Sequence, residues 1–355
     1  MKTNNDSDNF GIKEIARLAK VSIATVDRVI HNRPGVSKKT KENIDRIIDE
    51  LGYTPNVFAR RLASRKILNF AVLIPEVSEE TDFWEAPLRG VEQAELEIKQ
   101  NGINISKYFF NLNKKDSFLE ATRLVLDSHP DGILLAPSFI EESIAFLKSC
   151  DELKIPYVLI NSDLPKQNSL CYIGPDLFQS GSVAAHLANY LLAEGDKILI
   201  VNISKEIEKD HELLRKEKGV YDYFENSAKK IKILKTDIKN TDYDSVAKTL
   251  SKIMETDPDI KLMFVTNSRV STVARYLVKL ELPHILLIGY DFIKQNIYYL
   301  ENGSIDFLIC DKPKEQGYRG IMALYQTLVF DAVVDNIYFM PIDIITKQNS
   351  RFYLS

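Results

Sequence analysis

Residues 11–65 read GIKEIARLAKVSIATVDRVIHNRPGVSKKTKENIDRIIDELGYTPNVFARRLASR. Apolar side chains from Ile12 to Ala19 recur at the spacing of one helix face, which predicts a first amphipathic helix. Ser22 stands at an N-cap position, and a second helix is expected over residues 23–31. Two short helices joined by so short a turn are typical of a helix-turn-helix, whose second helix enters the major groove of DNA.

A third helix is expected to begin at Ser37 and to end at Gly52, after a turn at residues 32–35. Its isoleucines would pack on the first two helices and close a small core. Three lysines crowd its first turn, where positive charge opposes the helix dipole. They indicate either a phosphate bound at this helix start or an ordinary solvated face, and they are Lys38, Lys39 and Lys41.

Charge is unevenly distributed along the chain. Residues 1–66 contain 14 Lys and Arg against 8 Asp and Glu, a net +6, whereas the rest of the chain carries −10 and the whole −4. A basic segment joined to an acidic body is typical of a nucleic-acid-binding module on a larger globular domain.

The stretch at residues 11–65 resembles the lac repressor family of bacterial transcription regulators. The matching positions are Ile12, Lys13, Ile15, Ala16, Ala19, Val21, Ser22, Thr25, Val26, Arg28, Val29, Asn32, Val36, Ser37, Thr40, Leu51, Gly52, Tyr53, Pro55, Asn56, Ala59, Arg60 and Leu62. The resemblance implies that Ile23, Ala24 and Arg28 read bases, while hydroxyl and amide groups around them hold phosphates. The implied DNA contacts are Ser22, Ile23, Ala24, Thr25, Arg28, His31, Ser37, Tyr53, Asn56, Ala59 and Leu62.

Two side chains of the second helix bear on specificity. The guanidinium of Arg28 matches the O6/N7 edge of guanine, a contact that discriminates by about 1–3 kcal/mol, although a plain phosphate contact is the alternative. Asp27 departs from the family pattern, because a carboxylate beside phosphate is repulsive. It either pairs with Arg17 or Arg28, the interpretation we favour, or accepts a hydrogen bond from a cytosine amine.

Residues 57–66 follow as a short segment that is marginal as an isolated helix in water. The resemblance implies a hinge helix that folds only on the operator, where Leu62 wedges a base step of the minor groove and Ala59 is its small packing partner. Ordinary packing of Leu62 against the body is the alternative. The wedge implies a homodimer, or a larger oligomer, on a palindromic operator of double-stranded DNA.

From residue 67 on, apolar runs such as LNFAVLI, GILLAP, KILIVN, KLMFVT and HILLIGY alternate with helical stretches. Such runs predict parallel sheets covered on both faces, and the length of this part favours two lobes. The body resembles the type I periplasmic-binding-protein fold. The expected fold is therefore a small all-α helix-turn-helix domain joined to an α/β body of two doubly wound parallel-sheet lobes. The expected boundaries are 1–56, a hinge at 57–66, a body at 67–355, an N-lobe at 67–161 with 292–323 and a C-lobe at 162–291 with 324–355.

Ligands of such sheets lie outside the carboxyl ends of the strands. The residues at these ends are Asp82, Phe83, Trp84, Pro137, Ser138, Asn161, Asp163, Asn267, Asp291 and Asp311. Acidic and amide groups suit a polyhydroxylated ligand, and an aromatic ring suits the apolar face of a sugar; the alternative for Phe83 and Trp84 is that they are core residues. The resemblance supports Asn161, Asn267 and Asp291 as effector contacts, and it gives Arg215 or Lys216 the role of a family arginine. Asp311 stands where the family often has Gln. The predicted effector site comprises Phe83, Trp84, Asn161, Arg215, Lys216, Asn267, Asp291 and Asp311.

Other classes of protein are less well supported. No phosphate-binding glycine loop, zinc-protease motif or GxSxG elbow occurs, and the three cysteines form no CxxC pair, so we expect no enzyme, no cofactor and no metal site. The polar N-terminus and the absence of a long apolar run predict a cytoplasmic protein without a membrane partner. We expect a regulator, a repressor of carbohydrate-utilisation genes that responds to a sugar or sugar derivative. The alternatives are a solute-binding transport protein and a sugar-modifying enzyme that uses Asp291 or Asp311 as acid or base.

Overall fold

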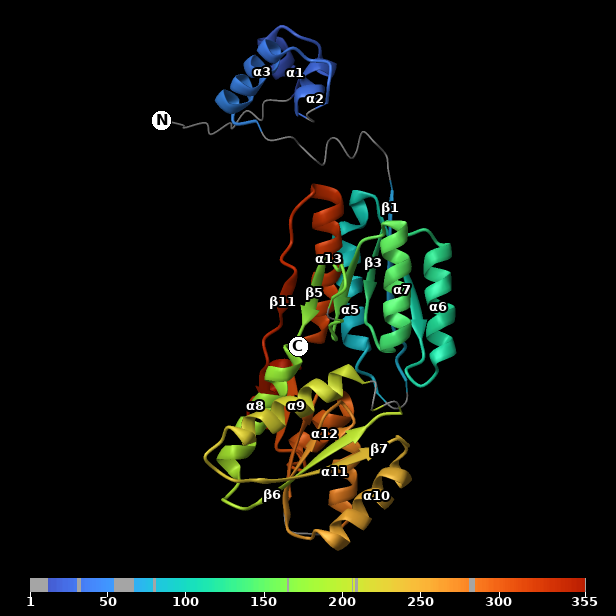
Figure 1. The fold of residues 1–355 in the computed structure, drawn as a ribbon, viewed down its shortest axis with the longest axis vertical. Coiled ribbons are helices and arrows are strands. Elements are labelled where there is room, and N and C mark those ends of the chain that lie inside the picture. Colours follow the sequence, from blue (N-terminus) through green and yellow to red (C-terminus); the bar gives the residue numbers. More distant parts are fainter. Residues whose placement is uncertain are drawn as a thin grey trace. The chain divides into compact units, whose positions relative to one another are not determined.

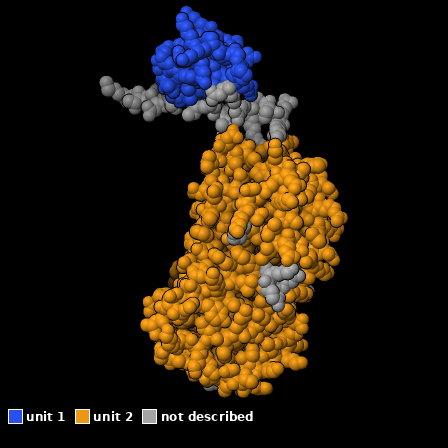
Figure 2. Space-filling view, viewed as in Figure 1, with its two compact units in different colours: residues 1–66 blue, residues 67–355 orange. Residues whose placement is uncertain are grey.

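The computed structural model describes residues 12–30, 33–53, 67–78, 81–164, 166–205, 207, 210–280 and 285–354. The chain divides into two compact units, Met1–Lys66 and Ile67–Ser355, which Figure 2 colours separately. Each unit has a hydrophobic core of its own. No helix in the described ranges is both long and apolar enough to span a membrane.

The first unit contains the three helices that the sequence predicts, α1 (Ile12–Ala19), α2 (Ile23–Ile30) and α3 (Lys38–Leu51). One side chain from each helix, Ile15, Val26 and Ile44, is fully buried where the helices meet. The small core expected from the apolar spacing is thus confirmed.

The helix ends of this unit are capped as the sequence indicates. The hydroxyl of Ser22 accepts a hydrogen bond from the Thr25 amide, and Ser37 accepts one from the Thr40 amide, each at 3.2 Å. Gly52 ends α3 in the left-handed conformation with φ 58°, which glycine adopts without a Cβ clash.

The first lobe of the second unit is a sheet of parallel strands in the order β11-β5-β4-β3-β1-β2. Helices α6 and α7 cover one face, and α5 and α13 cover the other (Figure 1). The elements are β1 (Leu68–Pro75), α5 (Glu85–Ile98), β2 (Ile103–Phe110), α6 (Lys115–Asp127), β3 (Gly132–Leu135), α7 (Ile140–Leu153), β4 (Tyr157–Ile160), β5 (Cys171–Gly174), α13 (Pro313–Phe330) and β11 (Ile337–Phe339).

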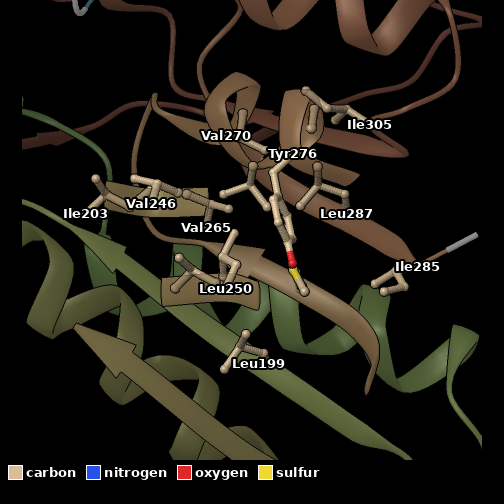
Figure 3. Close-up of a cluster of buried hydrophobic side chains, with 14 of the residues drawn as sticks. Leu199, Ile203, Val246, Leu250, Val265, Val270, Tyr276, Ile285, Leu287 and Ile305 are labelled. Carbon is tan, nitrogen blue, oxygen red and sulfur yellow. The ribbon is translucent and has the colours of Figure 1, made fainter. Parts of the chain in front are cut away.

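The second lobe repeats this arrangement in the order β12-β10-β9-β8-β6-β7, with only β12 antiparallel to its neighbour. Figure 3 shows one of its cores, in which Val246 and Leu250 of α10 and Tyr276 of α11 gather on the sheet. The elements are α8 (Leu177–Leu191), β6 (Lys197–Ile203), α9 (His211–Glu225), β7 (Lys232–Ile238), α10 (Tyr243–Thr256), β8 (Ile260–Val265), α11 (Val270–Lys279), β9 (Leu286–Tyr290), α12 (Lys294–Glu301), β10 (Phe307–Cys310) and β12 (Asp343–Ile345).

One helix pair in the second lobe packs through glycine. A Cβ on Gly219 of α9 would lie 2.1 Å from the Phe178 carbonyl oxygen, and one on Gly181 of α8 would lie 1.9 Å from the Lys216 carbonyl oxygen. The two helices therefore touch backbone to backbone, which fixes the position of α9 over the sheet.

The lobe boundaries expected from the sequence need correction. Strand β5 pairs with β4, and β11 pairs with β5, so both belong to the sheet of the first lobe. Strand β10 pairs with β9 and belongs to the sheet of the second lobe. The chain therefore passes between lobes after β5, after β10 and after β11. Hence 162–174 and 324–339 belong with the first lobe, and 292–310 with the second. The runs of β5, β11 and β12 are only three or four residues long and carry no distinctive pattern.

Candidate functional site

Helix α2 presents its polar and small side chains to solvent. Ser22, Ala24 and Arg28 are exposed and Ile23 is 46% exposed, whereas Val29 on the opposite face is buried. An exposed apolar side chain and an exposed arginine on the same helix are suited to contact base edges in a major groove.

Both helix starts carry a pair of hydroxyls. Ser22 lies 2.9 Å from the Thr25 hydroxyl, and Ser37 lies 2.8 Å from the Thr40 hydroxyl. These groups and the amides behind them can donate to phosphate oxygens. Tyr53 packs partly buried against the core of this unit, and burial raises the pKa of its phenol.

Asp27 pairs with a different arginine from the two that the sequence suggested. Its carboxylate accepts from Arg33 at 3.1 Å, while Arg17 bonds Glu14 at 2.6 Å. The predicted charge partner for Asp27 is present, but it is Arg33 and neither Arg17 nor Arg28. The Arg33 backbone amide donates to the Arg28 carbonyl oxygen at 2.8 Å, which holds Arg33 beside α2. Arg28 has no ion-pair partner in the described part of the chain.

Four of the predicted DNA contacts, and with them the hinge, lie outside the described residues. They are His31, Asn56, Ala59 and Leu62.

A cavity of about 320 Å³ lies between the two lobes of the second unit. Its wall brings together five of the eight predicted effector contacts: Phe83, Trp84, Asn161, Asn267 and Asp291. Arg215, Lys216 and Asp311 are not part of the wall. Pro137 and Ser138, which also follow a strand, contribute to it, whereas Asp82 and Asp163 do not.

Asn161 is held on three sides. Its backbone amide donates to Gln316 Oε1 at 2.9 Å and to the Ile173 carbonyl oxygen at 3.3 Å. Its carbonyl oxygen lies 3.2 Å from the Tyr172 hydroxyl, and its Nδ2 donates to Glu212 Oε2 at 3.1 Å. Among the described residues its Oδ1 has no partner, so this oxygen can accept a hydrogen bond from a ligand.

Asn161 and Asp291, both on the cavity wall, adopt the left-handed backbone conformation, with φ 69° and φ 72°. Asn and Asp tolerate this region better than other residues with a Cβ, and such conformations gather at functional sites.

The other predicted contacts differ in whether their side chains are already engaged within the protein. Asn267 uses its Nδ2 on the Ile203 carbonyl at 2.7 Å and its Oδ1 on the Arg269 amide at 3.2 Å, and so shapes the wall. Phe83 and Trp84 are 7% and 5% exposed and meet edge to face at 5.0 Å between centroids. They pack as core residues while also lining the cavity.

A buried cation lies beneath the cavity. Lys216 is 1% exposed, donates to Glu212 and to the Thr266 carbonyl, and lies 3.7 Å from the centre of the Tyr290 ring. Burial alone would lower the pKa of Lys216, but the negative groups around it, Glu212 foremost, raise it. The role of a ligand-facing cation expected for Lys216 thus gives way to a structural one, because Lys216 points at the sheet.

Two carboxyl groups share this buried region. Burial, and the proximity of Asp311, raise the pKa of Asp291 well above its ordinary value. Burial likewise raises the pKa of Asp311 to about 6, although Lys216 pulls it down. Of the two, Asp291 is the member that reaches the cavity.

Sequence reasoning missed several polar wall residues: Ser204, Lys205, Asp210, His211, Glu212 and Arg269. Burial and Glu212 raise the pKa of Asp210 to about 6, while burial lowers the pKa of the His211 imidazole. The strand-end rule that selected Asn267 would also have selected Ser204, which follows β6, and Arg269, which follows β8. His211 and Glu212, in the first turn of α9, do not directly follow a strand, so this rule does not select them.

Comparison with known proteins covers both units. The family described as bacterial regulatory proteins, lacI family, matches residues 11–56, and the periplasmic binding protein domain matches residues 70–331. Catabolite control protein A of Priestia megaterium is 30% identical over 258 residues, which span 72% of this chain and 74% of that protein. Matches to other curated relatives, HTH-type transcriptional regulators among them, span about half the length of those proteins.

Two solved structures share the fold of the second unit. A protein from Bacteroides fragilis described as a LacI transcriptional regulator is 27% identical, with a TM-score of 0.73, over 81% of this chain and 100% of that one. A glucose-galactose binding protein from Geobacillus stearothermophilus is 20% identical, with a TM-score of 0.71, over 80% of this chain and 99% of that one. From its helix-turn-helix unit, its two-lobed body and these matches, the chain belongs to the lacI family of bacterial regulatory proteins.

Proposed function

We propose that this chain is a repressor that binds a palindromic operator as a homodimer and responds to a sugar or sugar derivative in the inter-lobe cavity. The observation that carries the DNA-binding part is the exposed face of α2, where Ile23, Ala24 and Arg28 stand free of the core. Hydroxyl-capped helix starts at Ser22 and Ser37 supply phosphate contacts.

Carbohydrate as the effector is supported by the chemistry of the cavity. Oδ1 of Asn161 and the carboxyl of Asp291 can accept from hydroxyls, while Trp84 offers an aromatic surface at the same wall. The names of two similar proteins, a catabolite control protein and a glucose-galactose binding protein, agree with this chemistry. Carbohydrate-utilisation genes are the corresponding targets.

Regulation would follow from closure of the lobes. A ligand that binds the closed body better than the open one shifts the equilibrium between them, and operator and ligand then alter each other's affinity by the same factor. Such a regulator acts in the cytoplasm, where its operator is, and Leu62 of two subunits would meet at the operator dyad.

Two measurements on the full chain test this function. Selection from a random duplex library should enrich one palindromic sequence. A thermal-shift screen of sugars and sugar acids should yield a compound that raises the melting temperature, because a ligand that binds only the folded state stabilises it. At a ligand concentration of 100 times Kd the free energy of unfolding rises by about 2.7 kcal/mol. Asp291→Asn should abolish the shift and leave the selected duplex bound.

The alternatives give different results. A solute-binding transport protein would show the thermal shift and enrich no duplex, and an enzyme would convert the bound sugar, which mass spectrometry of the recovered ligand detects. Either result would reject the proposal.

A further inference from the structure

The turn at Asn161 is hydrogen-bonded toward two of the segments at which the chain passes between lobes. Gln316 accepts from the Asn161 amide at 2.9 Å, and its own Nε2 donates to the Asp311 carbonyl oxygen at 2.9 Å and to Asp311 Oδ1 at 3.2 Å. The Tyr172 hydroxyl lies 3.2 Å from the Asn161 carbonyl oxygen and 2.8 Å from that of Pro175. Asp311 follows β10 and Pro175 follows β5, so each belongs to a crossing.

These contacts are shielded from water. Gln316 is 1% exposed, Tyr172 is 4% exposed and Asn161 is 8% exposed. A buried donor or acceptor that loses its partner cannot recover a hydrogen bond from solvent. The geometry of the Asn161 turn therefore depends on the position of the crossing at Asp311.

The amide of Gln316 is chemically suited to this place. One end accepts from a backbone amide of the first lobe while the other donates to the crossing. A carboxylate could only accept, and an apolar side chain could do neither. Asp311 also faces Lys216 and Glu212 from α9 and Asp291 from the end of β9, so a further carboxylate at position 316 would meet negative charge.

Tyr172 explains the glycine that ends β5, directly before the other crossing. A Cβ on Gly174 would lie 2.3 Å from the Tyr172 hydroxyl oxygen, so the residue that ends β5 must leave room for that hydroxyl. Both crossings are thus built around groups that reach Asn161.

We propose that Gln316 is a positioning residue that ties the ligand-facing turn at Asn161 to the inter-lobe crossing at Asp311, with Tyr172 as a second tie to the other crossing. Opening or closing the lobes then moves Asn161, and fixing Asn161 with a ligand favours one lobe angle. The inference rests on the proposed ligand role of Asn161, but its test needs no ligand.

The test uses amide hydrogen exchange of the full chain, with protection factors corrected for the intrinsic rate, in peptides that contain Asn161. Gln316→Met should lower protection there about tenfold at both pH 5 and pH 8, since about 1.4 kcal/mol corresponds to a factor of ten. Gln316→Glu should match that loss at pH 8 and approach wild-type protection at pH 5, because the protonated carboxyl can donate to Asp311 again. Gln326→Met, at an exposed position of the same helix, is the matched control and should change nothing.

Three results would overturn the proposal. Unchanged protection at Asn161 in Gln316→Met would show that the tie does not hold the turn. A loss spread evenly over both lobes would reduce Gln316 to packing. An equal loss for Gln316→Glu at both pH values would show that donation to Asp311 is irrelevant.

Tyr172→Phe supplies a second test through the other crossing. It removes one hydroxyl and keeps the ring, and it should lower protection at Asn161 while α6 and α7 keep theirs; no change at Asn161 would remove Tyr172 from the proposal. If the sugar screen finds no ligand but the exchange results are as expected, the proposed function is contradicted. The proposed tie between Asn161 and the crossing at Asp311 is not.

Discussion

Nδ2 of Asn161 donates to Oε2 of Glu212 at 3.1 Å, and this bond joins the first lobe to the second across the cavity. Glu212 uses its other oxygen on Lys216, so one carboxylate serves both the lobe contact and the buried cation. A ligand that enters the cavity meets a carboxylate already engaged on both sides.

Glu212→Gln should therefore cost more than a surface change of the same kind. Its amide presents a donor where either Asn161 or Lys216 needs an acceptor, so we expect the free energy of unfolding to fall by about 1–3 kcal/mol. Urea denaturation measures this, with Glu225→Gln at the exposed end of α9 as the control. Equal stabilities for the two variants would mean that water replaces the Glu212 contacts.

Asp311→Asn should change how stability depends on pH. Burial raises the pKa of Asp311 from 3.8 to about 6, so the folded state holds this proton more tightly than the unfolded chain. The resulting stabilisation is complete below pH 4 and is lost as the pH rises through 6. Relative to wild type, the variant should gain about 1–3 kcal/mol between pH 4 and pH 7. Unfolding curves at several pH values measure this, with exposed Asp335→Asn as the control. A difference in the free energy of unfolding between Asp311→Asn and wild type that did not change with pH would contradict the prediction.

Arg28→Ala should relax preference at one base pair of the operator. A bidentate contact to guanine discriminates by about 1–3 kcal/mol, so the variant should bind the cognate and the substituted operator almost equally. Fluorescence anisotropy on both duplexes measures this, and Arg46→Ala, on the exposed face of α3, is the control. Uniform weakening on every duplex would show that Arg28 touches only phosphate.

Gly219→Ala should destabilise the second lobe. The added Cβ would meet the Phe178 carbonyl oxygen at 2.1 Å, and forcing two helices apart costs about 1–3 kcal/mol. Thermal unfolding should show a lower melting temperature, while Lys218→Ala on the neighbouring exposed position leaves it unchanged. A wild-type melting temperature for Gly219→Ala would mean that α8 and α9 can separate freely.

The parts of the fold that sequence predicts are those with a long pattern. The eight residues LNFAVLIP of β1 are almost all buried, and this apolar run is long enough to predict a strand. The four residues CYIG of β5 are also buried, but the run is too short to be recognised as a strand from sequence. The lobe boundaries failed for that reason, since short strands decide which sheet a segment joins. Helix α2 was predicted nearly residue for residue because cap, spacing and turn all agree.

The cavity was partly predictable for a similar reason. Asn161 and Asp291 follow strands, and the strand-end rule reaches them. Glu212 lies in the first turn of α9, and its approach to Asn161 depends on how the lobes face each other, which no local pattern encodes. Lys216 was misjudged because its fully buried position results from the packing of α9 through Gly181 and Gly219.

The left-handed backbone at Asn161 and Asp291 has an evolutionary consequence. Val or Ile at either position would strain the turn, whereas Gly, Asn and Asp adopt this conformation at the lowest cost. Asn and Asp codons differ by a single nucleotide, yet the two side chains differ in charge and in what they donate. A descendant of this protein could thus acquire a new ligand preference by one point mutation, with the main chain of the cavity unchanged.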